Sequence, residues 1–434
     1  MIIEYQVKNH LSFKELTIFS MVGMKSFKEH EPDNIIQVDE KLKVLKSASI
    51  YGNNGSGKSN FVKSLRFMKG FVLNSFRDTL LEENEKKIAL EKFLLNSACE
   101  SLPSYFELSL MIENTLYRYG FEIEADKINK EWLFHTTTKE VPLFNRNGND
   151  IVVNKSSFKE GLGLTKIKEN VLFLTRIAYD AGAISTKIIN WFKNFNVING
   201  INDVGHKSYT TQKLKEDKDF QKWVSKFVAF LEISTVSTEE TDMPEMSLES
   251  LKKTNQDDDL IDLLATIQKT QTKQPKTDNI ITWHRKYDAN NFLIDTIPFH
   301  FEKHESEGTK KLLYLLGPWY DTLINGKVLI VDELDSRLHT NLIQYLVSFF
   351  HKSNETHAQL IFVTHNTHLL SKDYLRRDQI WFIEKNQFGA SEMYSLGDFK
   401  SEQVRKKSAF DKNYIAGKYG TIPFLVENNI VKIK

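Results

Sequence analysis

The chain carries, at residues 48–62, the sequence Ala48-Ser49-Ile50-Tyr51-Gly52-Asn53-Asn54-Gly55-Ser56-Gly57-Lys58-Ser59-Asn60-Phe61-Val62. It contains the full pattern G-x-x-x-x-G-K-S. Glycines at 52, 55 and 57 let successive backbone N–H groups turn towards an anion, because no Cβ stands in the way. The helix expected after the pattern adds its positive N-terminus. This is the phosphate-binding loop of ATPases and GTPases.

The motif predicts which residues hold a nucleotide. Lys58 should reach the β and γ phosphates, and the Ser59 hydroxyl should ligate Mg²⁺. The predicted nucleotide-binding set is Gly52, Asn53, Asn54, Gly55, Ser56, Gly57, Lys58, Ser59 and Asn60. A merely flexible glycine turn is the alternative interpretation.

The sequence around the loop supports the motif. Residues 44–51 are apolar enough for a buried strand, and Phe61, Leu65, Met68 and Val72 share one face of a helix. Strand, glycine loop and helix follow one another in the order that the motif requires.

Composition narrows the class of protein. The 434 residues allow two or three domains or one interrupted domain, and 58 Lys+Arg against 57 Asp+Glu leave a net charge of +1. Nucleic-acid binding would therefore need a local basic patch. The single cysteine, Cys99, excludes an internal disulfide framework. Without an apolar run of membrane-spanning length or a signal-peptide pattern, we expect a cytoplasmic protein with no membrane partner.

A second acidic motif follows much later in the chain. Val328-Leu329-Ile330-Val331-Asp332-Glu333 is an apolar strand that ends in two carboxylates. Such a strand is buried in a parallel sheet, and its carboxyl end opens onto the nucleotide. We expect Asp332 to hold Mg²⁺ and Glu333 to orient and deprotonate the attacking water. An ordinary strand end is the alternative.

A histidine closes the next predicted strand, residues 359–363. His365 follows the two carboxylates by one strand–helix–strand unit, so it can hydrogen-bond the γ-phosphate or the attacking water. A satisfied strand-end histidine is the alternative. Zinc pairs formed by His365 with His368, or by His300 with His304, are not supported by a further ligand cluster.

The rest of the chain predicts an α/β fold with an antiparallel sheet. Alternating residues indicate strands near 3–7 and 16–18, and a hairpin of residues 106–112 and 117–123, with Asn114 in the left-handed conformation at its turn. Residues 132–144 extend that sheet, and 171–174 form a weak strand. Residues 77–100 are expected to be helical.

Aromatic residues at helical spacing begin near residue 181, and residues 234–278 are polar and charged. We therefore expect three parts: an N-terminal half of the ATPase head, 1–180; a helical insertion, 181–280; and a C-terminal half, 281–434. Asp257-Asp258-Asp259 in the insertion is interpreted as the acidic start of a helix rather than a metal site.

A possible signature motif precedes the acidic strand. Ser306-Glu307-Gly308 opens a predicted helix, where a hydroxyl and backbone N–H groups can meet an anion, although a simple helix cap is the alternative. In this order the motifs resemble the ABC-type ATPase heads of the SMC, RecF and overcoming-lysogenisation-defect proteins. The resemblance implies that Ser306 and Gly308 contact the γ-phosphate held by Lys58 of another protomer. It also implies that residues 334–339 form the D-loop and that His365 is the switch histidine.

More narrowly, the chain is similar to the RloA and AbiL ATPases and to the ATPase components of the PARIS and Septu phage-defence systems. The similar segments are Val7–Phe13, Gly52–Ser59, Asp332–His339 and Gly417–Pro423. The chain departs from the transporter pattern at Glu307, where transporters have glycine, and at His339, where they have aspartate. No Q-loop glutamine is assigned between residues 75 and 110.

The resemblance implies a conformational ATPase. ATP and Mg²⁺ bound between two heads would control a separately encoded effector, often a nuclease, during phage infection. A DNA-repair or chromosome-associated ATPase that grips DNA directly is the alternative. An AAA+ ring remodeller would need an arginine finger and a lid domain, and a small-molecule kinase would use residues 181–280 as a lid.

Overall fold

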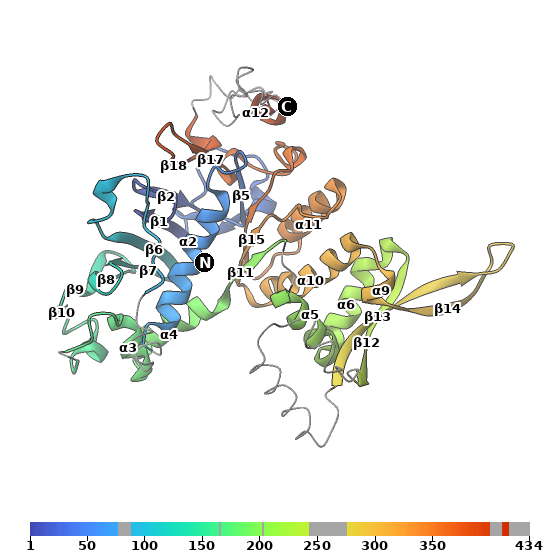
Figure 1. The fold of residues 1–434 in the computed structure, drawn as a ribbon, viewed down its shortest axis with the longest axis horizontal. Coiled ribbons are helices and arrows are strands. Elements are labelled where there is room, and N and C mark those ends of the chain that lie inside the picture. Colours follow the sequence, from blue (N-terminus) through green and yellow to red (C-terminus); the bar gives the residue numbers. More distant parts are fainter. Residues whose placement is uncertain (77–87, 165, 202–203, 243–275, 400–409, 416–434) are drawn as a thin grey trace, which may run out of the picture. The chain divides into compact units, whose positions relative to one another are not determined.

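Residues 1–76, 88–164, 166–201, 204–242, 276–399 and 410–415 are described by a computed structural model (Figure 1). The chain forms two compact units. The first combines Met1–Asn202 with Asp321–Lys434, and the second comprises Asp203–Tyr320. The first unit is thus made from two separated stretches of sequence.

A six-stranded sheet forms the centre of the first unit. Its spatial order is β11 (Phe195–Asn199), β15 (Val328–Asp332), β16 (Gln359–Val363), β5 (Ser47–Tyr51), β17 (Ile380–Lys385) and β18 (Ser391–Ser395). The first five strands are parallel, and β18 returns antiparallel to β17. Every residue of β5, β15 and β16 is buried, as in parallel sheets covered on both faces. The buried strands predicted before Asp332 and His365 are confirmed. The predicted strand 44–51 is divided: residues 47–51 form β5, whereas residues 43–45 form a separate strand of another sheet.

An antiparallel sheet is the second layer of this unit. Its order is β10 (Asp150–Val153), β9 (Glu140–Asn147), β8 (Ile128–Thr136), β7 (Thr115–Ile123), β6 (Ser104–Ile112), β1 (Ile2–Lys8) and β2 (Thr17–Ser20). The predicted hairpin is therefore confirmed as β6 and β7. Its left-handed residue is Glu113, with φ of 54°, and not Asn114. A mostly parallel sheet together with an antiparallel one confirms the predicted α/β class.

Helices and short strands complete the first unit. They are α1 (Glu31–Asn34), β3 (Ile35–Gln37), β4 (Lys43–Leu45), α2 (Lys58–Asn74), α3 (Phe173–Tyr179), α4 (Ala183–Asn194), α11 (Thr340–Lys352) and α12 (Phe410–Ile415). The apolar face predicted for the helix after the glycine loop is buried in α2: Phe61, Leu65, Met68 and Val72 are each at most 1% exposed.

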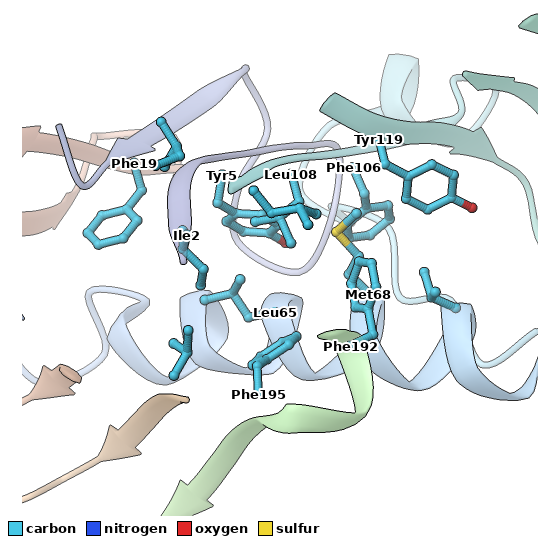
Figure 2. Packing of buried hydrophobic residues seen from close by; sticks show 14 of the residues in the cluster. Ile2, Tyr5, Phe19, Leu65, Met68, Phe106, Leu108, Tyr119, Phe192 and Phe195 are labelled. Atoms are coloured by element: carbon cyan, nitrogen blue, oxygen red, sulfur yellow. The ribbon is translucent and has the colours of Figure 1, made fainter. Parts of the chain in front are cut away.

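The main hydrophobic core lies between α2 and the strands that pack against it. Figure 2 shows Ile2 and Tyr5 of β1 pointing towards Leu65 and Met68 of α2, with Phe195 of β11 nearby. The Tyr5 ring also meets Phe61 edge-on, with centroids 5.8 Å apart. Burial of each such side chain contributes about 1.5–3 kcal/mol. The helix that follows the glycine loop is consequently held firmly between both sheets.

The second unit holds strands as well as helices. Its elements are α5 (Val204–Glu216), α6 (Lys218–Phe227), β12 (Ile233–Asp242), β13 (Lys276–Tyr287), β14 (Leu293–His300), α9 (Phe301–His304) and most of α10 (Glu307–Asn325). The three strands form an antiparallel sheet in the order β12-β13-β14. No helix in the described part of the chain is both long and apolar enough to span a membrane.

Two further local predictions are wrong. Residues 88–96 are not helical, because their backbone pairs with the loop after β1: Leu11 N–H donates to Glu91 O at 2.8 Å. Residues 173–174 begin helix α3 and are not a strand, because the buried Glu131 carboxylate accepts the N–H groups of Phe173 and Leu174. Such an acceptor satisfies the free donors of a helix start. The segments 257–259 and 417–423 lie outside the described residues.

Candidate functional site

The glycine loop joins β5 to α2 in a conformation that requires glycine. Gly57 has φ of 111°, in the left-handed region. A Cβ there would lie 2.2 Å from Ser391 Oγ and 2.7 Å from Ser12 Oγ. A side chain at this position would strain the backbone and would have to displace both serine hydroxyls.

A cluster of small polar side chains fixes the glycine loop by hydrogen bonds. Ser391 Oγ donates to Ser56 O at 2.6 Å and lies 2.8 Å from Ser12 Oγ. Asn60 Nδ2 donates to the same Ser12 Oγ at 2.9 Å. These bonds connect the loop to β18 and to the turn after β1, so its shape is fixed by three parts of the first unit. Ser12 lies in the Val7–Phe13 segment that resembles defence ATPases, and Ser391 lies outside every motif; the sequence does not predict this role for either.

Lys58 is folded back into the loop. Its Nζ donates to the carbonyls of Gly52 and Asn53, each at 2.8 Å, and the residue is only 5% exposed. Burial lowers the pKa of the Lys58 ammonium, while Asp332 and Glu333 oppose that shift. The hydroxyl of Ser56 is buried without a hydrogen-bond partner. A buried cation in a glycine-rich loop, together with an unsatisfied hydroxyl, fits a phosphate group.

Ser59 and Asp332 meet at the start of α2. Ser59 Oγ donates to Asp332 Oδ1 at 3.3 Å, and Asp332 is 7% exposed. Burial raises the pKa of the Asp332 carboxyl, and Ser59 and the cations of Arg66, Lys58 and Lys63 lower it in part. One hydroxyl and one buried carboxylate are oxygen ligands suited to Mg²⁺, with water and phosphate oxygens completing the shell. The residues that the sequence predicts for Mg²⁺ thus lie together.

Glu333 directly follows β15 and has an unusual backbone. Its φ is 56°, the left-handed region, which glutamate rarely adopts. The turn is closed by the Ser336 N–H, which donates to Glu333 O at 3.2 Å, and Leu334 N–H donates to Val363 O at 3.0 Å. Glu333 is one of the residues that line the pocket at the glycine loop.

His365 lies two residues beyond the end of β16, beside Asp335. Its backbone N–H donates to Asp335 Oδ2 at 3.0 Å, so the Asp335 carboxylate fixes the backbone at His365. Burial and the Lys58 charge lower the pKa of the His365 imidazole, while Asp335, Glu333 and Asp332 oppose that shift. A neutral imidazole can donate one hydrogen bond from a ring nitrogen.

These groups surround one pocket of about 330 Å³. It is lined by Asn54, Gly55, Ser56, Gly57, Lys58, Ser59, Asn60, Glu333, His365 and Lys385. The first nine are predicted site residues that the fold brings together. Lys385, at the end of β17, was not predicted, although the sheet places β17 directly beside the loop strand β5.

Asn199 is a second side chain that the sequence did not indicate. It ends β11, which pairs with β15 so that Asn199 lies opposite Asp332. Its Oδ1 accepts the Ile201 N–H at 2.7 Å. The signal in the sequence is an asparagine at the end of a short strand that follows an aromatic-rich helix. This segment lies within the predicted helical insertion, 181–280.

The predicted signature residues lie in the second unit. Ser306 precedes α10, and its Oγ accepts the Thr309 N–H at 3.1 Å and lies 2.9 Å from Thr309 Oγ1. Gly308 is in the first turn of that helix. Ser306 is thus a helix N-cap with an exposed hydroxyl, a geometry that suits both interpretations made from the sequence.

Comparison with known proteins identifies the family of this chain. Residues 47–371 match the family model described as "AAA domain, putative AbiEii toxin, Type IV TA system". The range begins in β5 and ends beyond His365, so it includes every predicted site residue. No curated protein matches the chain.

Solved structures with a similar fold include two SMC heads. The SMC head domain from Thermotoga maritima has 13% identity and a TM-score of 0.41, and the match covers 91% of this chain and 98% of that one. An SMC head bound to the C-terminal winged-helix domain of ScpA has 10% identity and a TM-score of 0.41, with 93% and 99% covered.

Proposed function

Because the chain belongs to the AAA-domain family named after the AbiEii toxin of type IV toxin–antitoxin systems, we propose that it binds ATP with Mg²⁺ and hydrolyses it. One observation carries this proposal: Lys58, Glu333 and His365 line a single pocket, and Ser59, from the same pocket, is bonded to Asp332. This combination provides phosphate binding, a metal site and a base, which are the requirements for phosphoanhydride hydrolysis.

The residues divide the chemistry between them. The loop N–H groups and Lys58 hold the β and γ phosphates, and Ser59 and Asp332 hold the metal ion. Bound Mg²⁺ would withdraw charge from the phosphate oxygens. Glu333 orients a water molecule and accepts its proton as the water oxygen bonds to the γ-phosphorus and the bond to the β-phosphate oxygen breaks. His365 donates a hydrogen bond to a γ-phosphate oxygen.

The second part of the proposal concerns assembly. Two heads bind ATP between them, and Ser306 and Gly308 of one protomer contact the γ-phosphate held by its partner. The exposed Ser306 hydroxyl at the start of α10 supports this role. Hydrolysis would then separate the heads, so that the nucleotide controls the association of two copies.

The consequence of that switch is control of a partner effector in anti-phage defence. The family description names a toxin and a toxin–antitoxin system, which supports a second component. The resemblance to defence ATPases suggests that this component is a separately encoded nuclease. Direct DNA binding by the heads is the competing function, and a strongly salt-dependent affinity for duplex DNA that rises with ATP would favour it.

The proposal is tested by nucleotide binding. The wild-type chain should bind ATP in the presence of Mg²⁺ and release phosphate, and Lys58→Ala should do neither. Lys352→Ala, which removes an exposed lysine at the end of α11, is the matched control and should behave as wild type. Equal ATP affinity of wild type and Lys58→Ala would refute the assignment of the glycine loop.

A further inference from the structure

The left-handed backbone of Glu333 has to be held in place by its surroundings. A non-glycine residue in this region costs about 1 kcal/mol or more relative to an ordinary conformation. Glu333 is also one of the residues that line the pocket. The neighbours of its backbone therefore decide where the carboxylate lies.

One such neighbour is Gly200, which directly follows β11. The Gly200 N–H donates to Asp332 O at 2.6 Å. A Cβ at position 200 would lie 2.1 Å from Glu333 O, 2.6 Å from Asp332 O and 2.7 Å from the Glu333 carbonyl carbon. All three atoms belong to the backbone, so the contact cannot be relieved by a side-chain rotation.

We propose that Gly200 is a positioning residue for Glu333, an inference that rests on the proposed ATPase function. Its N–H fixes the end of β15, and its missing side chain leaves the space that the Glu333 carbonyl occupies in the left-handed turn. Any side chain at position 200 displaces the Glu333 peptide and moves its carboxylate. The phosphate-binding loop is held separately, by Ser12 and Ser391, so the shape of the loop does not depend on Gly200.

The first test compares hydrolysis with binding. Gly200→Ala should lower kcat by at least about tenfold, because a displacement of about 1 Å from the reactive geometry costs up to about 100-fold. Its Kd for ATP should stay within about twofold of wild type. Gly205→Ala is the matched control, since a Cβ there meets nothing within 4 Å, and it should keep full activity. An unchanged kcat for Gly200→Ala, or equal losses of binding and hydrolysis, would overturn the inference.

A second test separates positioning from general damage. In the Glu333→Gln background, Gly200→Ala should cause little further loss of hydrolysis, because the carboxylate it displaces is already absent. A full additional tenfold loss would show that Gly200 acts through another group.

The third test does not need activity. Thermal unfolding should give a Tm about 2 °C higher for Glu333→Gly than for Glu333→Ala, since glycine adopts the left-handed turn without strain. Gly200→Ala should lower Tm less in the Glu333→Gly background than in the Glu333→Ala background. Equal effects in both would contradict the proposed contact. If the wild type hydrolysed no ATP, the proposed function would fail while this comparison still tested the role of Gly200.

Discussion

The Ser59 hydroxyl donates to the carboxylate of Asp332 at 3.3 Å, across 273 positions of sequence. The bond joins the first turn of α2 to the last residue of β15. Two groups predicted separately to bind Mg²⁺ are thus adjacent before any metal binds, and little rearrangement is needed to hold one.

Ser59→Ala should therefore weaken the binding of Mg²⁺ rather than nucleotide recognition by Lys58. We expect the Mg²⁺ concentration for half-maximal phosphate release to rise about tenfold, as for other lost ligands. Ser59→Thr keeps the hydroxyl and should remain near wild type. A titration of phosphate release with Mg²⁺ measures both, and an unchanged Mg²⁺ requirement in Ser59→Ala would exclude Ser59 as a ligand.

Asp332→Asn should stabilise the protein without ligand and remove its response to ATP and Mg²⁺. Burial raises the pKa of Asp332 in the folded state, so the ionised carboxylate costs stability at pH 7. That cost is absent below about pH 4, near the pKa of an unfolded aspartate, and complete above the folded pKa. The Tm of Asp332→Asn should exceed that of wild type at pH 7 and match it at low pH. A lower Tm at pH 7 would contradict this assignment.

Lys385 supplies a positive charge to the pocket from β17. Lys385→Ala should raise the Kd for ATP about fivefold, as expected for one charged contact in a partly screened site, and Lys385→Arg should restore most of the affinity. Fluorescent-nucleotide titration at low and high salt checks this. If Lys385→Ala bound ATP as tightly as wild type at low salt, the side chain would only border the pocket.

The assembly proposal predicts complementation between two inactive variants. Lys58→Ala lacks a functional loop, and Ser306→Arg lacks a functional signature, so each should be inactive alone. An equimolar mixture should regain about a quarter of wild-type hydrolysis, because half of the dimers are mixed and each mixed dimer has one intact site. No recovery after exchange of subunits would argue against sites shared between two protomers.

The strands and helices that the sequence predicts correctly are those determined by local residue patterns. The strand before Gly52, the apolar face of α2, and the buried strands that lead to Asp332 and His365 each have their own signal, and the structure confirms them. Their convergence could also be expected, because parallel strands end at the same edge of a sheet.

The missed features depend on residues distant in sequence. The start of α3 is set by Glu131, and the extended segment near Glu91 is set by its pairing with Leu11. The role of Gly200 depends on its contact with the Glu333 backbone, and that of Ser391 on its contact with Gly57. None of these contacts produces a periodic pattern in the sequence. Local propensity therefore predicts a helix near Glu91 and a strand at the start of α3.

The most direct test of the central claim is ATP turnover by Glu333→Gln. We expect this variant to bind ATP with a Kd within about twofold of wild type, because Lys58 and the loop are intact, and to release phosphate at least about 100-fold more slowly, because the base is lost. Gel filtration with light scattering should show the ATP-bound variant accumulating as an associated species. Phosphate release at the wild-type rate would contradict the account.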